Sequence, residues 1–594
     1  MTTPRNSRGA IALASLLALA ACSAHQSLPR SGTDAAARYV EAAAGSDAND
    51  GSAVHPYRTI GKCATTAKRG QTCIIRAGIY HEVLKPNSGI TIRSGGGTVM
   101  LLATDPVTGW KRSAGSIYVA RVTVNPHLAA GQVFIGPATT LVNEAQWPAP
   151  SNDPMHPNWA IERAGSGKTA IVDPTLPTSD LAGAIVNAWS GVDPWTHVTG
   201  VVTSASGGTI AFAPEGDGCP YFCSMPGGFY YVTGARALLR GQNEWWYDAH
   251  AHLLYLWASK GADPNKLDVE VKQRQVAIDL RGRSDVTVSN LSIAGAGVAM
   301  DARSRGNVLD TIDARYISSV THSPNNVYYS YGNYPLESGL VLAGSHNTIQ
   351  NSTIAYSATS GVLLSGSGNA VTNSLIHDVD WLGDYSAGVV PISPGNSISH
   401  TTIYNVGRSA ITFGPTARID IGYNNLFNSS LLSVDDAVIY ACCFPQANGT
   451  RVHDNWVHAE IRPHGRLPHS NTCGCPWGGI YIDNGLGGIE TDHNVVWASY
   501  PGIFLHGEPR EPSIRDRVDY NTVLPGSQSI WLLNLAGYRG TEASHNRIPT
   551  PIATDDSSKQ LPQTDNSRTA PGAGAIGQPG CSFAGCTPPG ALPR

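Results

Sequence analysis

Acidic residues in the last third of the chain have the types and spacing that carbohydrate chemistry requires. Asp435 and Asp436 open the segment DDAVIY, Glu460 ends RVHDNWVHAE, and Asp483 lies in GGIYIDNG. Glycoside hydrolysis uses two carboxyl groups, about 5–5.5 Å apart for retention or 6.5–9.5 Å for inversion of configuration. One of the two must be kept protonated by an apolar or acidic environment.

Asp436 and Glu460 meet this demand best if they lie in adjacent coils of a repeat. We predict Asp436 as nucleophile or base and Glu460 as acid. Asp435 would raise a neighbouring pKa by like-charge repulsion, while Arg408 would keep the other carboxyl ionised. Asp483 with His506 is the second candidate pair. A structural network of salt bridges and turns is the alternative for all of these residues.

Five residues are candidates for contacting a substrate. They are Arg408, Asp435, His458, His506 and Trp147. Trp147 belongs to NEAQWP, which also contains Asn143 and Glu144. Together with Trp245, these residues could form the far wall of a sugar cleft. Because tryptophan also fills cores, burial inside a sandwich is equally open for Trp147 and Trp245.

The elements that must position these residues are repeats between 280 and about 550. Gly-led apolar strands alternate with Asn-led strands at a period of about 22 to 30 residues, which predicts a three-strand coil of a solenoid. The Gly-led strands begin at Gly339, Gly361, Ser409, Ala437, Gly479 and Gly502. Asn347, Asn369 and Asn396 predict a stacked turn ladder.

Alignment of these strands in one column places Arg408 beside Asp436. Neighbouring coils lie about 4.8 Å apart, so we expect the two side chains within salt-bridge reach. Asp483 falls at the other end of its strand, where it stacks on His506. At about 3.3 Å per residue, Asp483 would be too far from Asp436 for a close carboxylate pair.

The repeat signal disappears from about 105 to 270, where short alternating strands predict an inserted antiparallel β-sandwich. The expected fold is therefore all-β, a right-handed parallel β-helix with that insertion. The predicted divisions are 1–21 signal peptide, 22–37 tether, 38–104 first coils, 105–270 sandwich, 271–554 coils with the active site, and 555–594 Pro/Gly-rich tail.

Several segments resemble bacterial β-helix polysaccharide enzymes. GSDANDG, PYRTI and GIYHEV resemble their opening coil, and DDAVIY, GTRVHDNWVHAE, GGIYIDNG and VGRSAI resemble motifs of β-xylosidase-like β-helix glycosidases. The resemblance implies an exo-acting glycoside hydrolase of plant, algal or microbial polysaccharide or oligosaccharide. Asp435-Asp436-Ala437 replaces Asp-Gly-Gly, and Ala459-Glu460 replaces an Asp of the family pattern.

The first 22 residues indicate export. A basic start and an apolar stretch from Ala10 to Ala21 are typical of a signal peptide. The segment ending at Cys22 resembles a bacterial lipobox, which implies a lipoprotein anchored to a membrane by its lipid, periplasmic or on the cell surface. An ordinary secretory signal is the alternative.

Ten further cysteines in an exported chain favour disulfides. We expect Cys63 with Cys73, Cys219 with Cys223, Cys442 and Cys443 with Cys473 and Cys475, and Cys581 with Cys586. No cofactor is required. Calcium could bind the Asp47/Asn49/Asp50 turn, although an Asx-turn network without metal is favoured.

The formal net charge of −4 offers no basic surface for nucleic acid. The expected partner is a polysaccharide or oligosaccharide, and the sequence leaves the oligomeric state open. Two functions compete with hydrolysis. A polysaccharide lyase would need a base, commonly Lys or Arg, and lysine is scarce in the coils. A non-catalytic glycan-binding protein would not need crowded carboxylates.

Overall fold

The computed structural model describes most of the chain after residue 36. The described ranges are 37–128, 130–189, 194–195, 197–215, 226–320, 338–443, 446–459, 477–510, 513–525, 528–555, 563–567 and 579–587. The predicted signal peptide, Cys22 and the candidate acid Glu460 lie outside the described residues. Cys219, Cys223, Cys473 and Cys475 do as well.

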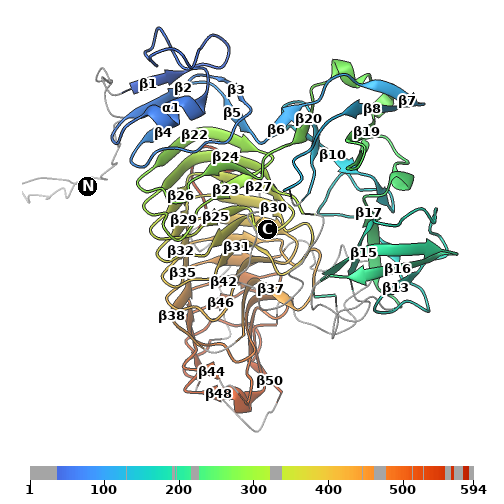
Figure 1. The fold of residues 1–594 in the computed structure, drawn as a ribbon. Coiled ribbons are helices and arrows are strands. Elements are labelled where there is room, and N and C mark those ends of the chain that lie inside the picture. The colour runs from blue at the N-terminus through green and yellow to red at the C-terminus, as the bar shows by residue number, and fades with distance from the viewer. Residues whose placement is uncertain are drawn as a thin grey trace, which may run out of the picture. The chain divides into compact units, whose positions relative to one another are not determined.

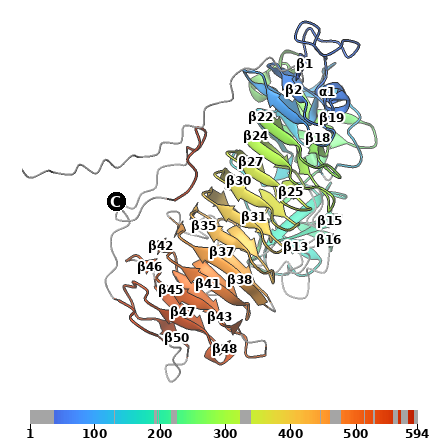
Figure 2. The same cartoon turned by 90° about the vertical axis from the view of Figure 1, so that its left-hand side faces the viewer.

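Parallel strands stack in three ladders, which Figures 1 and 2 show from β22 to β50. The first ladder comprises β22(Thr287–Ala294), β24(Val308–Ser318), β26(Thr348–Gln350), β29(Ala370–Thr372), β32(Ser397–Ser399), β35(Asp420–Gly422), β38(Gln446–His453), β41(Gly487–Asp492), β45(Arg517–Asp519) and β49(Glu542–Ser544). The second continues from β24 through β27(Thr353–Ser357), β30(Leu375–Val379), β33(Thr402–Val406), β36(Asn425–Phe427), β39(Trp456–His458), β42(Val495–Trp497) and β46(Thr522–Val523).

The third ladder forms a separate sheet. It comprises β21(Val276–Asp279), β23(Gly297–Ala299), β25(Leu340–Leu342), β28(Val362–Leu364), β31(Ala387–Pro391), β34(Ser409–Phe413), β37(Asp436–Cys442), β40(Trp477–Asp483), β43(Ile503–His506), β47(Ile530–Leu533) and β50(Ala553–Thr554). One coil takes one strand from each ladder, so the prediction of a parallel β-helix is confirmed.

The N-terminal coils begin before the insertion. They contain β1(Ala37–Val40), α1(Ile60–Thr66), β2(Thr72–Ile75), β3(Gly78–Tyr80), β4(Thr91–Ser94) and β5(Val99–Leu102). Because β4 and β5 pair with β22, the coils resume after the insertion where they stopped. A small pair, β44(Ser513–Ile514) and β48(Tyr538–Arg539), flanks the last coils.

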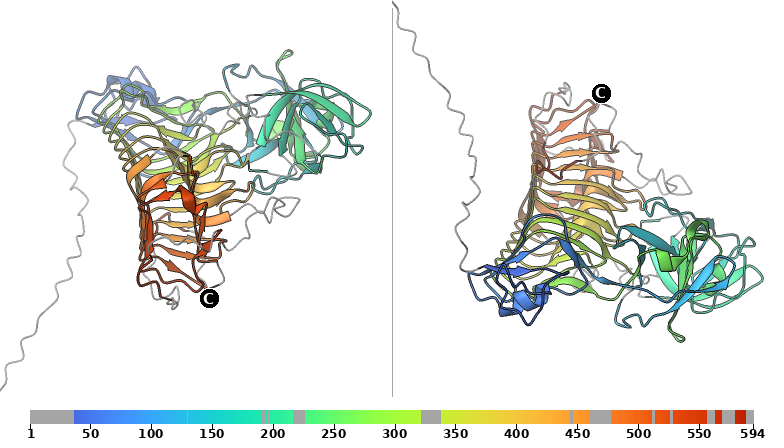
Figure 3. Two further views of the ribbon diagram at one scale, coloured as in Figure 1. Left: turned by 90° about the horizontal axis from the view of Figure 1, so that it is seen from below. Right: turned by 90° about the horizontal axis from the view of Figure 1, so that it is seen from above.

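The inserted residues form two mainly antiparallel sheets apart from the coils (Figure 3). The first sheet comprises β6(Thr104–Pro106), β7(Lys111–Ala114), β8(Ile117–Arg121), β9(Val133–Ile135), β10(Thr140–Glu144), β18(Glu244–Asp248), β19(Leu253–Trp257) and β20(Val269–Lys272). The second comprises β11(Gln146–Trp147), β12(Ala160–Ile161), β13(Ala170–Val172), β14(Ile185–Trp189), β15(His197–Ser206), β16(Thr209–Pro214) and β17(Phe229–Thr233).

A continuous apolar core runs inside the coils, where isoleucine, leucine and valine repeat at matching positions. The predicted asparagine ladder is confirmed. Asn347 donates to Asn369 at 3.0 Å, and the backbone N–H of Asn369 donates to Asn396 at 2.8 Å. Since a buried amide without partners is costly, this stacking fixes the register of successive turns.

Two predicted alignments are wrong by one residue. Ala437 pairs with Gly478 rather than Gly479, and His377 pairs with Tyr404 rather than Asn405. Asn405 has a φ of 52°, so it occupies the left-handed turn position after the strand column.

Disulfides join Cys63 to Cys73 and Cys581 to Cys586, as predicted. Among the described residues Cys442 and Cys443 are bonded to each other, and their predicted partners Cys473 and Cys475 lie outside the described ranges. The bond joins neighbouring residues at the end of β37, where their Cα atoms are 3.7 Å apart.

In the Asp47 turn, the Asp47 carboxylate accepts hydrogen bonds from the backbone N–H groups of Arg58 and Thr59, each at 2.9 Å. The Asx-type contact favoured by the sequence is made by Asp50, whose carboxylate accepts the backbone N–H of Ser52 at 2.8 Å. Over the described ranges, no helix is both long and apolar enough to cross a membrane.

Candidate active site

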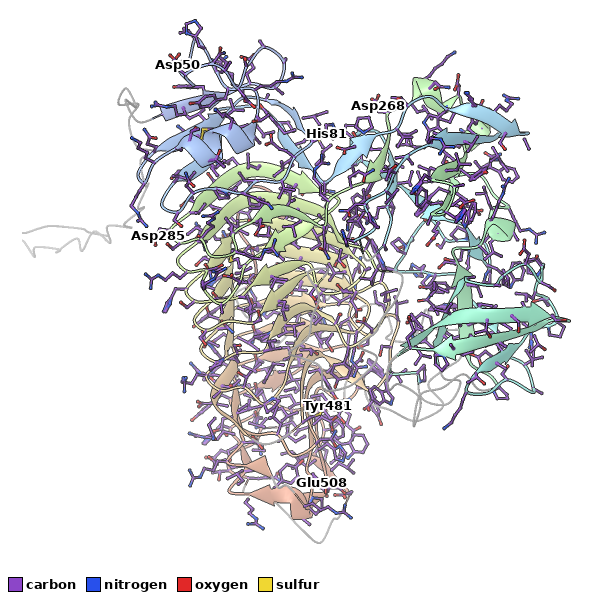
Figure 4. The ribbon with its side chains drawn as sticks, in the orientation of Figure 1. Asp50, His81, Asp268, Asp285, Tyr481 and Glu508 are labelled. Carbon is purple, nitrogen blue, oxygen red and sulfur yellow. A yellow bond between two sulfur atoms is a disulfide. The ribbon has the colours of Figure 1, made fainter. Side chains whose placement is uncertain are left out.

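The outward face of the third ladder carries a column of aromatic rings. Ile439 and Ala441 of β37 point into the core, while Tyr440 between them points outward, as alternation in a strand requires. Tyr481, labelled in Figure 4, lies next to Tyr440 on β40. Phe504 and Trp531 continue the column on β43 and β47.

Asp483 lies two residues beyond Tyr481 and faces the same side. Its Oδ2 accepts hydrogen bonds from the Tyr440 hydroxyl at 2.7 Å and from the Asn484 amide at 3.0 Å. Its Oδ1 lies 2.8 Å from Nδ1 of His506, so the predicted stacking of Asp483 on His506 is confirmed. Three donors therefore converge on one carboxylate, which as an ion is an acceptor only.

His506 is fixed from both sides. The Asn534 amide lies 3.0 Å from its Nε2, which leaves Nδ1–H to donate to Asp483. Burial lowers the pKa of His506, but the hydrogen bond and charge of Asp483 and the charge of Asp435 raise it, and the net shift is upward. The imidazole therefore protonates more readily than a free histidine.

Arg408 is 1% exposed and holds the loop that leads into β37. Its guanidinium donates to the Ser433 hydroxyl at 2.8 Å, to the Val434 carbonyl at 3.3 Å and to the Asp435 carbonyl at 2.9 Å. It also donates to the carbonyl of Trp195, a residue of the insertion. The group packs over the Tyr385 ring, 4.4 Å from its centroid.

The expected ion pair between Arg408 and Asp436 is not formed within 4.0 Å in the described part of the chain, because the guanidinium is directed at carbonyl groups. The two charges still interact. Burial lowers the pKa of Arg408, but Tyr385, Asp436, Tyr440 and Asp435 together raise it above its usual range.

Asp435 lies near both Arg408 and His506. It has a φ of 53° and is partly exposed, whereas the next residue, Asp436, is 0% exposed. The Asp435 carboxylate is close enough to raise the pKa of both Arg408 and His506. Asp435 and Asp483 therefore act on the same histidine.

Asp436 is buried behind this surface. Burial raises its pKa to about 7, although Arg408 and the Ser430 hydroxyl lower it in part. Among the described residues, no hydrogen bond of normal geometry reaches either oxygen. A carboxyl group in such surroundings is neutral at mildly acidic pH.

We expect wild-type protein to lose stability between pH 5 and pH 8 relative to Asp436→Asn. The pKa of the Asp436 carboxyl is about 7 in the folded protein and 3.8 in the unfolded chain. Its contribution to the free energy of unfolding is therefore complete below pH 3.8 and is lost as the pH rises through about 7. The loss is about 4 kcal/mol over the whole range from pH 3.8 to pH 7, and about 3 kcal/mol of it falls between pH 5 and pH 8. Urea unfolding at both pH values measures it, and a difference between the proteins that does not change with pH would contradict it.

Two further acidic residues, Asp380 and Asp384, lie one coil before Arg408. The Asp380 carboxylate accepts the backbone N–H groups of Arg408 at 2.8 Å and of Asp384 at 3.2 Å. Burial, followed by the charge and hydrogen bond of Asp384, raises the pKa of Asp380 well above its usual range. These hydrogen bonds give Asp380 a structural role in holding the turn before β34.

His458 and Trp147 lie elsewhere. His458 is 0% exposed, stacks between Phe427 and Trp497, and bonds Asn425 at 2.9 Å on the second ladder. Trp147 packs against the core of the second inserted sheet. The position of His458 therefore fits a structural network better than substrate contact, and the position of Trp147 fits a sandwich core better.

The sequence reasoning missed Tyr440, Asn484 and Trp195. Tyr440 and Tyr481 share the phrase Ile-Tyr in AVIY and GIYID, and this repeated outward tyrosine was a usable signal. Nothing in the sequence indicates that the Trp195 carbonyl meets Arg408.

A family model described as "Right handed beta helix region" matches residues 316–518, in agreement with the predicted handedness. A solved structure described as "Glycoside hydrolase" is 15% identical, with 92% of this chain and 99% of that chain covered and a TM-score of 0.55. XylC with xylose is 13% identical, with coverage of 89% and 86% and a TM-score of 0.48.

The lacto-N-biosidase of Eubacterium ramulus, native protein, is 10% identical, with coverage of 86% and 67% and a TM-score of 0.40. No curated protein matches the chain. At these identities the structural likeness shows the fold alone.

Proposed function

We propose that the chain is a glycoside hydrolase whose catalytic carboxyl groups are Asp483 and Asp435. The observation that carries this proposal is the Asp483 carboxylate at 2.8 Å from Nδ1 of His506, with Asp435 close enough for its charge to raise the pKa of the same histidine. Two carboxyl groups on one surface are the minimum that glycoside hydrolysis requires. The substrate is a polysaccharide or oligosaccharide, and Cys22, if lipidated after export, attaches the enzyme to a membrane.

Asp483 takes the role of nucleophile or base, because three donors orient its carboxylate and a fixed geometry favours attack or proton abstraction. Asp435 takes the role of acid, because its side chain is partly exposed and therefore accessible to a substrate. The sequence had favoured Asp436 in this pair, but Asp436 is 0% exposed and has no hydrogen-bond partner among the described residues. Asp435, in contrast, is partly exposed, and Asp483, although only 2% exposed, bonds the partly exposed His506. Glu460 stays a candidate substrate-facing acid from the sequence.

Exo-action is supported by the insertion, which reaches the site. Trp195 packs at the edge of the cluster that contains Tyr385 and Tyr440. An insertion that borders one side of a site restricts the length of chain that can pass through it.

Polysaccharide lyase chemistry is less well supported. Arg408, whose guanidinium donates to the Asp435 carbonyl, is buried, stacked on Tyr385 and bonded to carbonyl groups. It is therefore not free to abstract a proton from a substrate. A lyase would release a product with an unsaturated uronate chromophore, whereas a hydrolase releases a reducing sugar without one.

The test is a panel of aryl glycosides assayed with wild type, Asp435→Asn and Asp436→Asn. We expect Asp435→Asn to lower kcat about 10²- to 10⁴-fold, the range for general acid catalysis, and Asp436→Asn to lower it far less. Equal hydrolysis by wild type and Asp435→Asn would contradict the assignment. Loss in Asp436→Asn alone would return the role to Asp436.

A further inference from the structure

A cavity of about 180 Å³ lies where the insertion meets the coils. Gln132, Glu144 and Trp245 line it from the first inserted sheet and the residues beside it. Ser319, Ala358 and Trp381 line it from three successive coils, just after β24, β27 and β30. The volume is below the 300–1,000 Å³ that is typical of drug-sized ligands, which suits a single ring.

Gln132 is the most informative residue of this cavity. It is 3% exposed, and neither its amide nitrogen nor its amide oxygen has a hydrogen-bond partner among the described residues. A buried amide without partners costs free energy that the fold does not recover. Because the group lines an open cavity, a ligand that both accepts and donates a hydrogen bond would satisfy it.

The charges around the cavity favour a neutral ligand. Burial raises the pKa of Glu144 to about 7, so this carboxyl is a donor at acidic pH. Behind Ser319, the buried Lys272 ammonium donates to the Ser319 hydroxyl at 2.9 Å. Once ionised, Glu144 would repel an anion.

The aromatic residues add an apolar wall. The indole N–H of Trp245 donates to the Val142 carbonyl at 3.0 Å, so this ring offers only its apolar surface to a ligand. Trp381 lines the cavity from the coils. An amide, a carboxyl and apolar rings together match the alternating hydroxyl and C–H surface of a sugar ring.

We propose that this cavity is a binding site for an uncharged sugar ring, separate from the Asp483 site. Trp381 and Asp435 follow β30 and β36, which are two coils apart, so about 10 Å separates the two sites along the stack. The cavity carries no carboxyl pair and binds without catalysis. The inference goes beyond the proposed hydrolysis and does not depend on it.

The test titrates full-length Asp483→Asn protein with D-xylose, D-glucose, D-galactose and L-fucose, followed by tryptophan fluorescence and calorimetry. At least one sugar should give saturable binding. Gln132→Leu should weaken that binding at least tenfold, because the apolar side chain offers neither donor nor acceptor. Replacement of an unpaired buried amide by an apolar group is neutral or stabilising, so the variant should fold.

The matched control is Gln242→Leu, an exposed glutamine of the same inserted region that does not line the cavity. It should bind as the parent does. Equal affinity in Gln132→Leu, or no binding by any of the four sugars, overturns the proposal. Calcium binding that is abolished by Glu144→Gln would overturn it in favour of a cation site. Since binding is the readout, absence of hydrolysis does not affect the result.

Discussion

Asp483→Asn should lower kcat for an aryl glycoside about 10²- to 10⁴-fold, and the free energy of unfolding by about 1–3 kcal/mol because one donor loses its acceptor. Asparagine keeps the shape of the side chain and an acceptor oxygen for Tyr440, but it can neither attack an anomeric carbon nor take a proton. Steady-state kinetics, with circular dichroism to verify folding, measures both quantities.

Asp492→Asn provides the matched control. Asp492 is also a buried aspartate, 3% exposed, with a histidine Nδ1, that of His493, at 2.7 Å, but it lies on the first ladder. It also pairs with Arg451. This variant should lose stability and keep its kcat. A comparable loss of kcat in both variants would show that any buried aspartate is needed for folding, and would remove Asp483 from the mechanism.

Arg408→Met should lower the free energy of unfolding by about 3 kcal/mol or more, since each buried acceptor left without its donor costs about 1–3 kcal/mol. The carbonyl groups of Trp195, Val434 and Asp435 would lose their donor, and Asp436 would lose the cation that lowers its pKa. Because the Asp436 pKa would then rise further, the loss should be larger at pH 8 than at pH 5.

Urea unfolding at the two pH values checks this prediction. Arg281→Met is the control, since Arg281 is 41% exposed and pairs with Asp279 at the surface. Exposed pairs contribute about 0.2–1 kcal/mol. A loss for Arg408→Met as small as that for Arg281→Met would show that the loop before β37 is held by other contacts.

The coils were predictable because their signal is repeated and local. Each turn shows the same glycine and asparagine positions, and a buried asparagine such as Asn369 has a physical reason to recur. The stacking of Asp483 on His506 followed from the same alignment. The errors arose where the glycine that marks the column is missing: the register that pairs Val362 with Val389 and Ala387 with Ser409 puts Ala410, not Ser409, in line with Gly361.

The approach of Asp435 to His506 could not be read from the sequence. Asp435 has a left-handed backbone, with a φ of 53°, which the strand pattern of DDAVIY does not predict. The direction of the Arg408 guanidinium was equally hidden, because its acceptors are backbone carbonyl groups, which every residue possesses. Sequence indicates which charges are near one another better than it indicates which atoms they bind.

The loop between β36 and β37 also contacts the insertion through apolar residues. Leu431 and Leu432 pack with Met155, and Val434 packs with Trp189 and Phe229. The two regions are thus parts of one cooperative folding unit rather than a scaffold with a removable accessory. A shortened chain that joined residue 104 directly to residue 271 would expose those three side chains to water beside the catalytic surface, so minimal versions of this protein need to retain both regions.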